Sequence, residues 1–405
     1  MNEARVKYSI IVPVYNALKY LPTCIETVVC QGAQNYELII RDDNSTDGTF
    51  EFLNSLDDPK IRVIRPGNRI SMVEHFSWAL NHARGEWIMF LGGDDGLQSY
   101  FFELAETLTL QADKDKVRCI VSERAYFFWE GCDSLYGKIA VNYRACLGVK
   151  TLSWRYQSFL ALFGFKTYFE LPQMYTTSLF KRSLVLEAQN KMGGNFFVTV
   201  PADANLAAVG CSLERKYLKS EIPFSWVGTA PESCVTTMES VSIPKGSSSF
   251  KINYTEMAGN FAIRSCSLYY WNALLLTNAY QSGAINSFLR SKLFMTLLFS
   301  SVLDEIRSSK KIDAEPRLHF FKQAVKNNGL NYLSISLLQI PFLILRIFYI
   351  VYSRSMRIIF QLFTPKFSLN LFWGSNVKIK MLEVSKDINL SIRPIFKSFE
   401  ALLGK

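Results

Sequence analysis

The first 125 residues alternate short apolar, β-branched runs with longer segments of helical periodicity. Strands that alternate with helices are usually joined by right-handed crossovers in a single sheet. The pattern therefore predicts an α/β fold, with a mostly parallel sheet and flanking helices. The predicted strands are Tyr8–Val12, Tyr36–Arg41, Ile61–Ile64, Glu86–Leu91 and Arg118–Ser122. The predicted helices between them are Ala17–Gln31, Thr49–Leu56, Ser71–Arg84 and Tyr100–Leu110.

The pattern after residue 125 is less regular, because aromatic clusters mix with helical periodicity at Leu179–Gln189 and Ala202–Val209. Pro244, Gly246 and four serines predict a linker at residues 241–250. Beyond this linker the pattern is mainly helical and aliphatic. We therefore predict two units. They are a domain over residues 1–240, with halves 1–125 and 126–240, and a helical C-terminal region over residues 250–405.

Two adjacent aspartates, Asp94 and Asp95, follow the predicted strand Glu86–Leu91 directly. Ligands bind just beyond the carboxyl ends of strands in an open α/β sheet. Neighbouring carboxylates repel each other unless a cation or several donors hold them. Hard oxygen ligands suit Mg²⁺ or Mn²⁺, so the pair predicts a divalent metal carrying a diphosphate. The alternative is a solvated Asp-Asp-Gly turn without a ligand.

Polar residues also follow the first two strands, in Pro13-Val-Tyr-Asn16 and in Asp42-Asp-Asn-Ser-Thr-Asp-Gly-Thr49. The ring of Tyr15 offers a stacking face for a nucleotide base. The carboxylate of Asp43 can accept a hydrogen bond from a base, and that of Asp94 from a ribose hydroxyl. With Asp95 on a metal, this edge of the sheet is predicted to hold a nucleotide.

Three successive blocks, "SIIVPVYNALKYLPTCIETVVCQ", "YELIIRDDNSTDGT" and "ARGEWIMFLGGDDG", resemble those of glycosyltransferase family 2, which has the GT-A fold. The resemblance covers residues 6–125 strongly and residues 126–235 weakly. It implies a nucleotide-sugar donor, with Asp43 reading the base and the pair after the fourth strand contacting ribose (Asp94) and metal (Asp95). The other implied donor-binding residues are Pro13, Tyr15 and Asn16. The chain departs from many members at Gly92 and Gly93, where an acid is common, so weaker metal affinity is expected.

Inverting members of this family use a carboxylate as general base, which must reach the acceptor hydroxyl. The resemblance places that base at Asp203, at the start of a predicted helix. Glu170 and Glu187 are poorer candidates. The competing interpretation is that Asp203 only caps the helix.

The net charge of +10 is concentrated near the C-terminus, with nine Lys or Arg and no acid between Pro316 and Leu382. Arg346, Arg354 and Arg357 follow a 19-residue uncharged stretch, residues 327–345. We predict a basic amphipathic helix that lies in an anionic membrane interface. A core helix and a single membrane span, interrupted by Pro341, remain as alternatives. Truncation before Asn327 is then expected to leave a soluble core.

The eight cysteines show no CxxC pair, which predicts reduced thiols, no structural zinc and a cytoplasmic protein. Met1–Lys7 is polar and lacks the pattern of a signal peptide. We therefore expect a peripheral protein at the inner face of the cell membrane, or one held there by a single span. The aliphatic tail fits lipid better than nucleic acid, so no nucleic-acid partner is predicted.

The predicted function is a metal-dependent (Mn²⁺ or Mg²⁺) inverting glycosyltransferase that uses a nucleotide sugar, expected to be a UDP-sugar. The expected acceptor is a lipid-linked or polysaccharide hydroxyl in bacterial surface glycan synthesis, which rests on analogy and charge. A nucleotidyltransferase would carry a Gly-rich basic loop where this chain has Tyr15-Asn-Ala-Leu18. A membrane scaffold with weakened catalysis is the alternative from another class.

Overall fold

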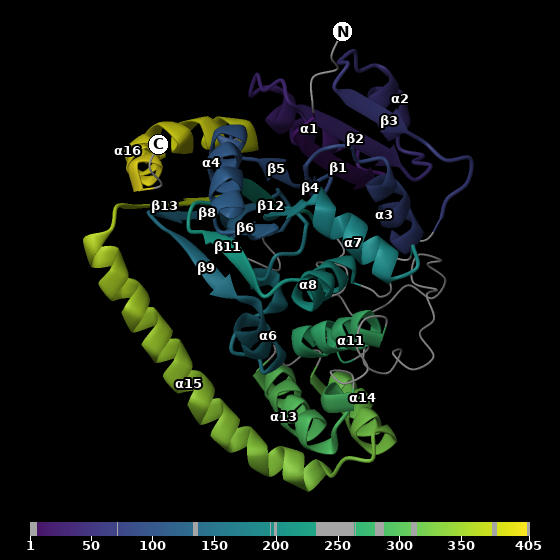
Figure 1. Ribbon diagram of the computed structural model, residues 1–405, viewed down its shortest axis with the longest axis vertical. Coiled ribbons are helices and arrows are strands. Elements are labelled where there is room, and N and C mark those ends of the chain that lie inside the picture. Colours follow the sequence, from purple (N-terminus) through teal and green to yellow (C-terminus); the bar gives the residue numbers. More distant parts are fainter. Residues whose placement is uncertain are drawn as a thin grey trace.

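The structure, a computed structural model, shows a body of sheets and helices with one long helix, α15, along its side (Figure 1). The predicted linker at residues 241–250 lies outside the described residues. The residues described are 6–70, 72–132, 137–194, 196–197, 201–231, 263, 265–279, 287–308, 314–374 and 379–402.

The central element is an eight-stranded sheet, sheet A, in the order β3-β2-β1-β4-β10-β6-β11-β9. Strands β1 to β4 are parallel, with Ile10 opposite Leu38 and Met89 on its two sides. The prediction of a mixed α/β fold with a mostly parallel sheet is therefore confirmed. The strands are β1 (Tyr8–Val14), β2 (Tyr36–Asp42), β3 (Ile61–Ile64), β4 (Trp87–Phe90), β6 (Cys119–Ser122), β9 (Val149–Ser153), β10 (Ser178–Lys181) and β11 (Lys216–Ser220).

Strand β10 corrects one prediction, because its residues were expected to begin a helix. It lies between β4 and β6 and is antiparallel to both. Leu179 and Phe180 are fully buried there, and the ladders on both sides satisfy their backbone groups. Only the following segment is helical, as α7 (Arg182–Lys191). The loop that leads into β10 therefore passes the end of β4, where Thr176 N–H donates to the carbonyl of Phe90.

Alternate residues of the strands face two different helix layers, as the pleat of a strand requires. Ile10 and Val12 belong to the core that includes α1 and α4, whereas Ile11 belongs to the core that includes α3, α7 and α8. The helices of residues 1–231 are α1 (Leu21–Val29), α2 (Thr49–Asn54), α3 (Met72–Asn81), α4 (Phe101–Lys114), α6 (Trp154–Leu162), the 3₁₀ turn η1 (Tyr168–Glu170), α7 and α8 (Ala202–Leu213).

A second sheet, sheet B, has the order β13-β8-β7-β12-β5. The two-residue connection Glu123-Arg124 leads from β6 in sheet A to β7 in sheet B. Loops from both sheets therefore meet near the carboxyl ends of β1 and β4. The strands of sheet B are β5 (Gly96–Leu97), β7 (Ala125–Phe128), β8 (Ile139–Cys146), β12 (Ser225–Thr229) and β13 (Lys366–Phe372).

The C-terminal region packs against the N-terminal half at two places. Strand β13 pairs antiparallel with β8 over its whole length. The last helix contacts α1, and its Met381, Ile388 and Phe396 lie in the same core as β1 and α4. The structure therefore departs from the predicted division, since this region contains a strand and completes the N-terminal core. Its helices are α11 (Cys266–Ala279), α13 (Lys292–Ser308), α14 (Ala314–Asn327), α15 (Tyr332–Phe363) and α16 (Met381–Leu402).

Candidate active site

A pocket of about 360 Å³ lies at the carboxyl ends of β1 and β4. Six of the seven predicted site residues line it: Pro13, Tyr15, Asn16, Asp94, Asp95 and Asp203. The seventh, Asp43, is not among the lining residues, although its backbone N–H donates to the carbonyl of Val14, which is one of them (2.9 Å). The fold therefore brings together side chains that are up to 190 positions apart in the sequence.

The carboxylate of Asp95 is buried and ties three segments of the chain together. One oxygen accepts from the backbone N–H of Gly228 (2.7 Å). The other accepts from the backbone N–H of Gly92 (2.8 Å) and from the hydroxyl of Thr176. Burial raises the pKa of Asp95, and these three donors oppose that rise. Asp95 thus fixes the ends of β4, β12 and the loop before β10 around the pocket.

Gly92 and Gly228 have no room for a side chain in this arrangement. A Cβ on Gly92 would lie 2.7 Å from a carboxylate oxygen of Asp95 and 2.8 Å from the hydroxyl of Tyr175. A Cβ on Gly228 would lie 1.7 Å from the carbonyl oxygen of Asp94. A side chain at residue 92 would therefore displace the carboxylate of Asp95 or the hydroxyl of Tyr175.

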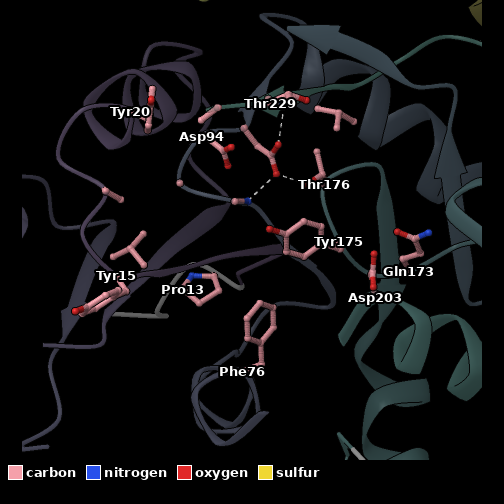
Figure 2. A pocket seen from close by; sticks show the side chains of 18 of the residues that line it. Pro13, Tyr15, Tyr20, Phe76, Asp94, Gln173, Tyr175, Thr176, Asp203 and Thr229 are labelled. Carbon is pink, nitrogen blue, oxygen red and sulfur yellow. Dashed lines mark hydrogen bonds between the residues drawn. The ribbon is translucent and has the colours of Figure 1, made fainter. Parts of the chain in front are cut away.

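Thr176 has a backbone φ of 43°, in the left-handed region that β-branched residues avoid. Its hydroxyl bonds to Asp95, and its N–H bonds to the carbonyl of Phe90 (2.6 Å). Such strain persists where several contacts determine the conformation, which is common in ligand sites. In Figure 2 the loop carrying Tyr175 and Thr176 lies between Asp94 and Asp203.

The charges in the pocket favour a bound cation. Among its described lining residues are three carboxylates, Asp94, Asp95 and Asp203, and one basic side chain, Arg124. A diphosphate would meet net negative charge here unless a cation accompanied it. Within the part of the chain that the structure describes, no cluster of three His, Cys, Asp or Glu side chains could hold a metal alone. The donor set fits a divalent ion that takes its remaining ligands from phosphate and water.

The side of the pocket predicted to hold the base is occupied by an arginine. The guanidinium of Arg69 lies 3.7 Å from the ring centroid of Tyr15 and 3.6 Å from the carboxylate of Asp43. Asp43 is buried, accepts from the N–H of Ile70 (3.2 Å) and lies 3.7 Å from the guanidinium of Arg41. Burial raises the pKa of Asp43, although these partners oppose the rise. A base can therefore stack on Tyr15 only if Arg69 moves, or if the base and the guanidinium of Arg69 contact the ring together.

Asn16 joins the ends of the first two strands. Its backbone N–H donates to the hydroxyl of Ser45 (2.8 Å), and its side-chain oxygen accepts from the N–H of Thr46 (2.9 Å). Its φ of 50° is a conformation that asparagine adopts more readily than most residues. Asn16 therefore shapes the rim of the pocket, whatever it contacts in a ligand.

Asp203 faces the pocket from the first turn of α8 and is not its cap, because the cap position is Pro201. Its carboxylate accepts from the hydroxyl of Tyr168 (3.2 Å) and from the N–H of Ala204 (2.8 Å). Burial raises the pKa of Asp203, and these two donors together with Arg124 oppose the rise. A carboxylate with a raised pKa is a stronger base while it remains ionised at neutral pH.

The weaker candidates lie elsewhere. Glu187 pairs with Arg118 (2.8 Å) and Lys191 (2.7 Å), and Glu170 pairs with Lys166 (3.3 Å). Neither glutamate is among the described lining residues of the pocket. Of the carboxylates considered as a base, only Asp203 lines the pocket that contains Asp94.

Sequence reasoning missed most of the residues that complete the site. These are Arg124, Tyr168, Tyr175 and Thr176, and Gly228 was given little weight. No spacing in the sequence distinguishes them. What these residues share is their place in the structure, because the β6–β7 junction and the loop before β10 reach the edge of the sheet where Asp94 lies.

Comparison with known proteins gives a match to the family model "Glycosyl transferase family 2" over residues 9–156. Glycosyltransferase GlyG of Streptococcus pneumoniae is 26% identical over 199 residues, which is 46% of this chain and 61% of GlyG. The UDP-Glc:alpha-D-GlcNAc-diphosphoundecaprenol beta-1,3-glucosyltransferase WfaP of Escherichia coli is 34% identical over 87 residues, 22% of this chain and 35% of WfaP. The chain therefore spans less than two thirds of each relative's length.

Among solved structures, TarS 1-349 of S. aureus in complex with UDP-GlcNAc has a TM-score of 0.45 and 14% identity, covering 81% of this chain and 93% of that chain. The sequence blocks that resemble the family, the parallel order β3-β2-β1-β4 and the acidic pair at the end of β4 all fall within the matched residues. Residues 9–156 of the chain therefore match glycosyl transferase family 2 in sequence.

Proposed function

We propose that this protein transfers a sugar from a nucleotide-sugar donor to an acceptor hydroxyl, with inversion at the anomeric carbon. The observation that carries the proposal is that Asp94 at the end of β4 and Asp203 on α8 line the same pocket. An inverting transfer needs both parts of such a site. One part takes the departing diphosphate, and a carboxylate removes the proton of the attacking hydroxyl.

The residues divide these tasks as follows. Asp203 accepts the proton of the acceptor hydroxyl as that oxygen attacks the anomeric carbon. Asp94 and Asp95 are the residues that would hold Mn²⁺ or Mg²⁺, and Asp95 also accepts three hydrogen bonds. When bound, the ion supplies positive charge to the leaving diphosphate. Asp43 and Tyr15 are proposed to contact the base, and Pro13 and Asn16 the adjoining part of the donor.

The finer substrate assignments are also proposals. We propose a UDP-sugar as donor and a lipid-linked or polysaccharide hydroxyl as acceptor, in the synthesis of a bacterial surface glycan. The names of GlyG and WfaP support this class, since WfaP is named for a UDP-Glc donor and a diphosphoundecaprenol acceptor.

Donor hydrolysis with a panel of nucleotide sugars, measured with Mn²⁺ and with chelator, tests this function. Asp203→Asn should lower turnover about 10²- to 10⁴-fold while donor affinity is kept, because only the proton acceptor is lost. Asp95→Asn should also lose activity, through metal binding or through collapse of the three-segment junction. If the protein binds donors but hydrolyses none, with or without metal, it is a membrane scaffold with weakened catalysis instead of an active glycosyltransferase.

We propose further that α15 places the protein on the cytoplasmic face of an anionic membrane. This helix carries the span Tyr332–Ile359, which is long and apolar enough to cross a bilayer and is only 11% buried. Leu345, Phe348 and Tyr352 are more than half exposed on its outer side. Its other side is docked, since Ile335, Gln339 and Arg346 pack toward α13. A helix with one docked and one apolar exposed side suits the plane of an interface.

The fold supports an interfacial helix rather than a span. α14 before the helix packs on α13, and β13 after it pairs with β8. A helix that crossed a bilayer would put these two neighbours on opposite sides, although both belong to one continuous packed body (Figure 1). An in-plane position leaves both contacts intact.

Sedimentation with vesicles of phosphatidylglycerol and phosphatidylcholine tests the membrane proposal. The double variant Leu345→Gln/Phe348→Gln should bind vesicles at least about tenfold more weakly, because each large apolar side chain contributes about 1.5–3 kcal/mol when buried. The matched control is Phe288→Gln/Leu390→Gln, which removes a phenylalanine and a leucine that are also more than half exposed and lie outside α15 in the sequence. If both variants and the wild type bind vesicles equally, α15 does not lie in the membrane interface.

A further inference from the structure

Arg124 occupies an unusual position for an arginine, because it lines the pocket without an ion pair to any described carboxylate. It lies on the junction between β6 and β7, with its guanidinium 5.3 Å from the ring centroid of Phe169 and 5.7 Å from that of Tyr126. One terminal nitrogen donates to the carbonyl of Phe169 (3.1 Å). Over the described residues, no Asp or Glu approaches its guanidinium within ion-pair distance (4.0 Å).

The Nε of Arg124 is buried and has no hydrogen-bond partner among the described residues. A buried N–H of a charged group is costly to leave unpaired, so such a donor usually awaits a ligand. The guanidinium also acts on both sides of the site, since its charge lowers the pKa of Asp95 and of Asp203. Arg124 therefore lines the same pocket as Asp95 and Asp203 and is close enough to influence both carboxylates.

We propose that Arg124 binds a phosphate group of a substrate in this pocket, an assignment that rests on the proposed function and names a further residue for it. A guanidinium presents several N–H donors in one plane, which matches phosphate oxygens better than any neutral side chain does. The aromatic rings of Phe169 and Tyr126 lie beside the guanidinium, and its buried Nε has no partner among the described residues. Arg124 is the one basic side chain among the described residues that line the pocket. Arg69 lies beside the pocket on the ring of Tyr15, but it is paired with Asp43.

Two sources of phosphate share this chemistry, namely the diphosphate of the donor and a diphosphate that links an acceptor sugar to a lipid. Binding to the full-length protein, measured by titration calorimetry with Mg²⁺, distinguishes them. The probes are inorganic pyrophosphate, UDP, uridine, farnesyl diphosphate and farnesol. Arg124→Met removes the charge and keeps the apolar stem, whereas Arg124→Lys keeps the charge and loses the planar donor edge. Arg155→Met, at an exposed arginine of α6, is the matched control.

We expect Arg124→Met to weaken pyrophosphate binding about 10- to 100-fold, as the loss of hydrogen bonds to a charged group typically does. Arg124→Lys should recover part of that loss, and Arg155→Met should change nothing. If the donor supplies the phosphate, UDP binding falls and uridine binding does not. If the acceptor supplies it, farnesyl diphosphate binding falls, UDP binding is kept and farnesol binding is unchanged.

The inference is overturned if Arg124→Met and Arg124→Lys bind all three phosphate probes within about twofold of the wild type, with an unchanged melting temperature. It is also overturned if the folded wild-type protein binds no phosphate probe. Should Arg124→Met fail to fold, the Arg124→Lys variant decides alone, because a loss confined to phosphate probes still identifies the contact. Failure of sugar transfer with intact pyrophosphate binding would count against the proposed function and leave this inference standing.

Discussion

Two glycines decide how closely the chain packs around the acidic pair. Gly92 and Gly228 each donate a backbone N–H to Asp95, and neither has space for a Cβ. Glycine is the residue that allows this close approach of backbone to side chain. The glycine at residue 92 is therefore part of a close packing in which the hydroxyl of Tyr175 lies near that position.

Gly228→Ala should disrupt this junction. Its new methyl carbon would lie 1.7 Å from the carbonyl oxygen of Asp94, so β12 must shift away from β4 and the bond to Asp95 must break. We expect donor hydrolysis to be lost and the melting temperature to fall by several degrees. Gly374→Ala, where no atom lies within 4 Å of the added carbon, serves as the control in the same assays. An active, stable Gly228→Ala variant would contradict the observed packing.

The hydrogen bond from Tyr168 should tune the pH dependence of the proposed base. The pKa of Asp203 is raised above its ordinary 3.8 by burial, and the Tyr168 hydroxyl lowers it by stabilising the carboxylate. The charge of Arg124 also lowers the pKa of Asp203. The pKa of the Cys266 thiol is raised by burial first, and then by the charges of Glu305 and Asp203. A base must be deprotonated, so the acid limb of the kcat profile should lie above pH 3.8.

In Tyr168→Phe this acid limb should move to higher pH, while the rate on the alkaline plateau stays close to that of the wild type. The sign follows because the variant loses a donor to the charged form of Asp203. Tyr143→Phe removes another buried hydroxyl, one that bonds to Tyr100 away from the pocket, and should leave the limb in place. If the acid limb does not shift in Tyr168→Phe, Asp203 is not the base in the rate-limiting proton transfer.

At the scale of elements, α15 combines two sides with different tasks. The sequence places Arg346, Arg354 and Arg357 together as a basic face for lipid. The structure instead pairs Arg346 with Asp304, and the same guanidinium donates to Ser301 and Phe163 on the docked side. Arg354 and Arg357 are exposed. Arg346 is thus an anchor of the helix, which leaves Arg354 and Arg357 as the exposed members of the predicted basic face.

Arg346→Met should therefore destabilise the protein. Both members of the pair are largely buried, and removing one partner leaves a buried carboxylate, which typically costs about 3–5 kcal/mol. Urea unfolding should show this loss in Arg346→Met and almost none in Arg354→Met, at an exposed arginine of the same helix. Equal stability of the two variants would mean that the ion pair does not form.

At the scale of the whole molecule, the C-terminal segment packs against the N-terminal half of the chain. Ser385 on α16 accepts from the N–H of Ser99 (2.8 Å) and donates to the side chain of Gln98 (3.0 Å), which lie just before α4. Strand β13 completes the edge of sheet B beside β8. The last forty residues therefore cover a core that begins at β1, and the N-terminal half is incomplete without them.

Truncation before Asn327 should consequently yield an aggregating fragment rather than the soluble core expected from the sequence. Removing β13 and α16 leaves β8 with an unpaired edge and exposes the apolar residues of α1 and α4 that α16 covers. Gel filtration and dye binding to exposed apolar surface would measure this. A monomeric fragment that still binds donor would show that the C-terminal region is a separate unit.

The sequence by itself determined the local features of this protein. Short apolar, β-branched runs predicted β1, β2, β3 and β4. Their alternation with helices predicted that they lie parallel in one sheet, because such strands are joined by right-handed crossovers. The same order predicted that Pro13, Tyr15, Asn16, Asp94 and Asp95 share one edge, since all follow parallel strands. These are short-range patterns, and the structure reproduces them.

Only the tertiary structure decided which distant segments complete the site. Leu179-Phe180 reads as the start of a helix, yet it becomes a strand because β4 and β6 offer a gap with hydrogen-bond partners on both sides. That placement carries Tyr175 and Thr176 to Asp95, and the junction of two sheets carries Arg124 into the pocket. Likewise, α16 packs into the N-terminal core, although almost the whole length of the chain separates it from β1. Contacts of this kind depend on packing between elements, and no periodicity in the sequence encodes them.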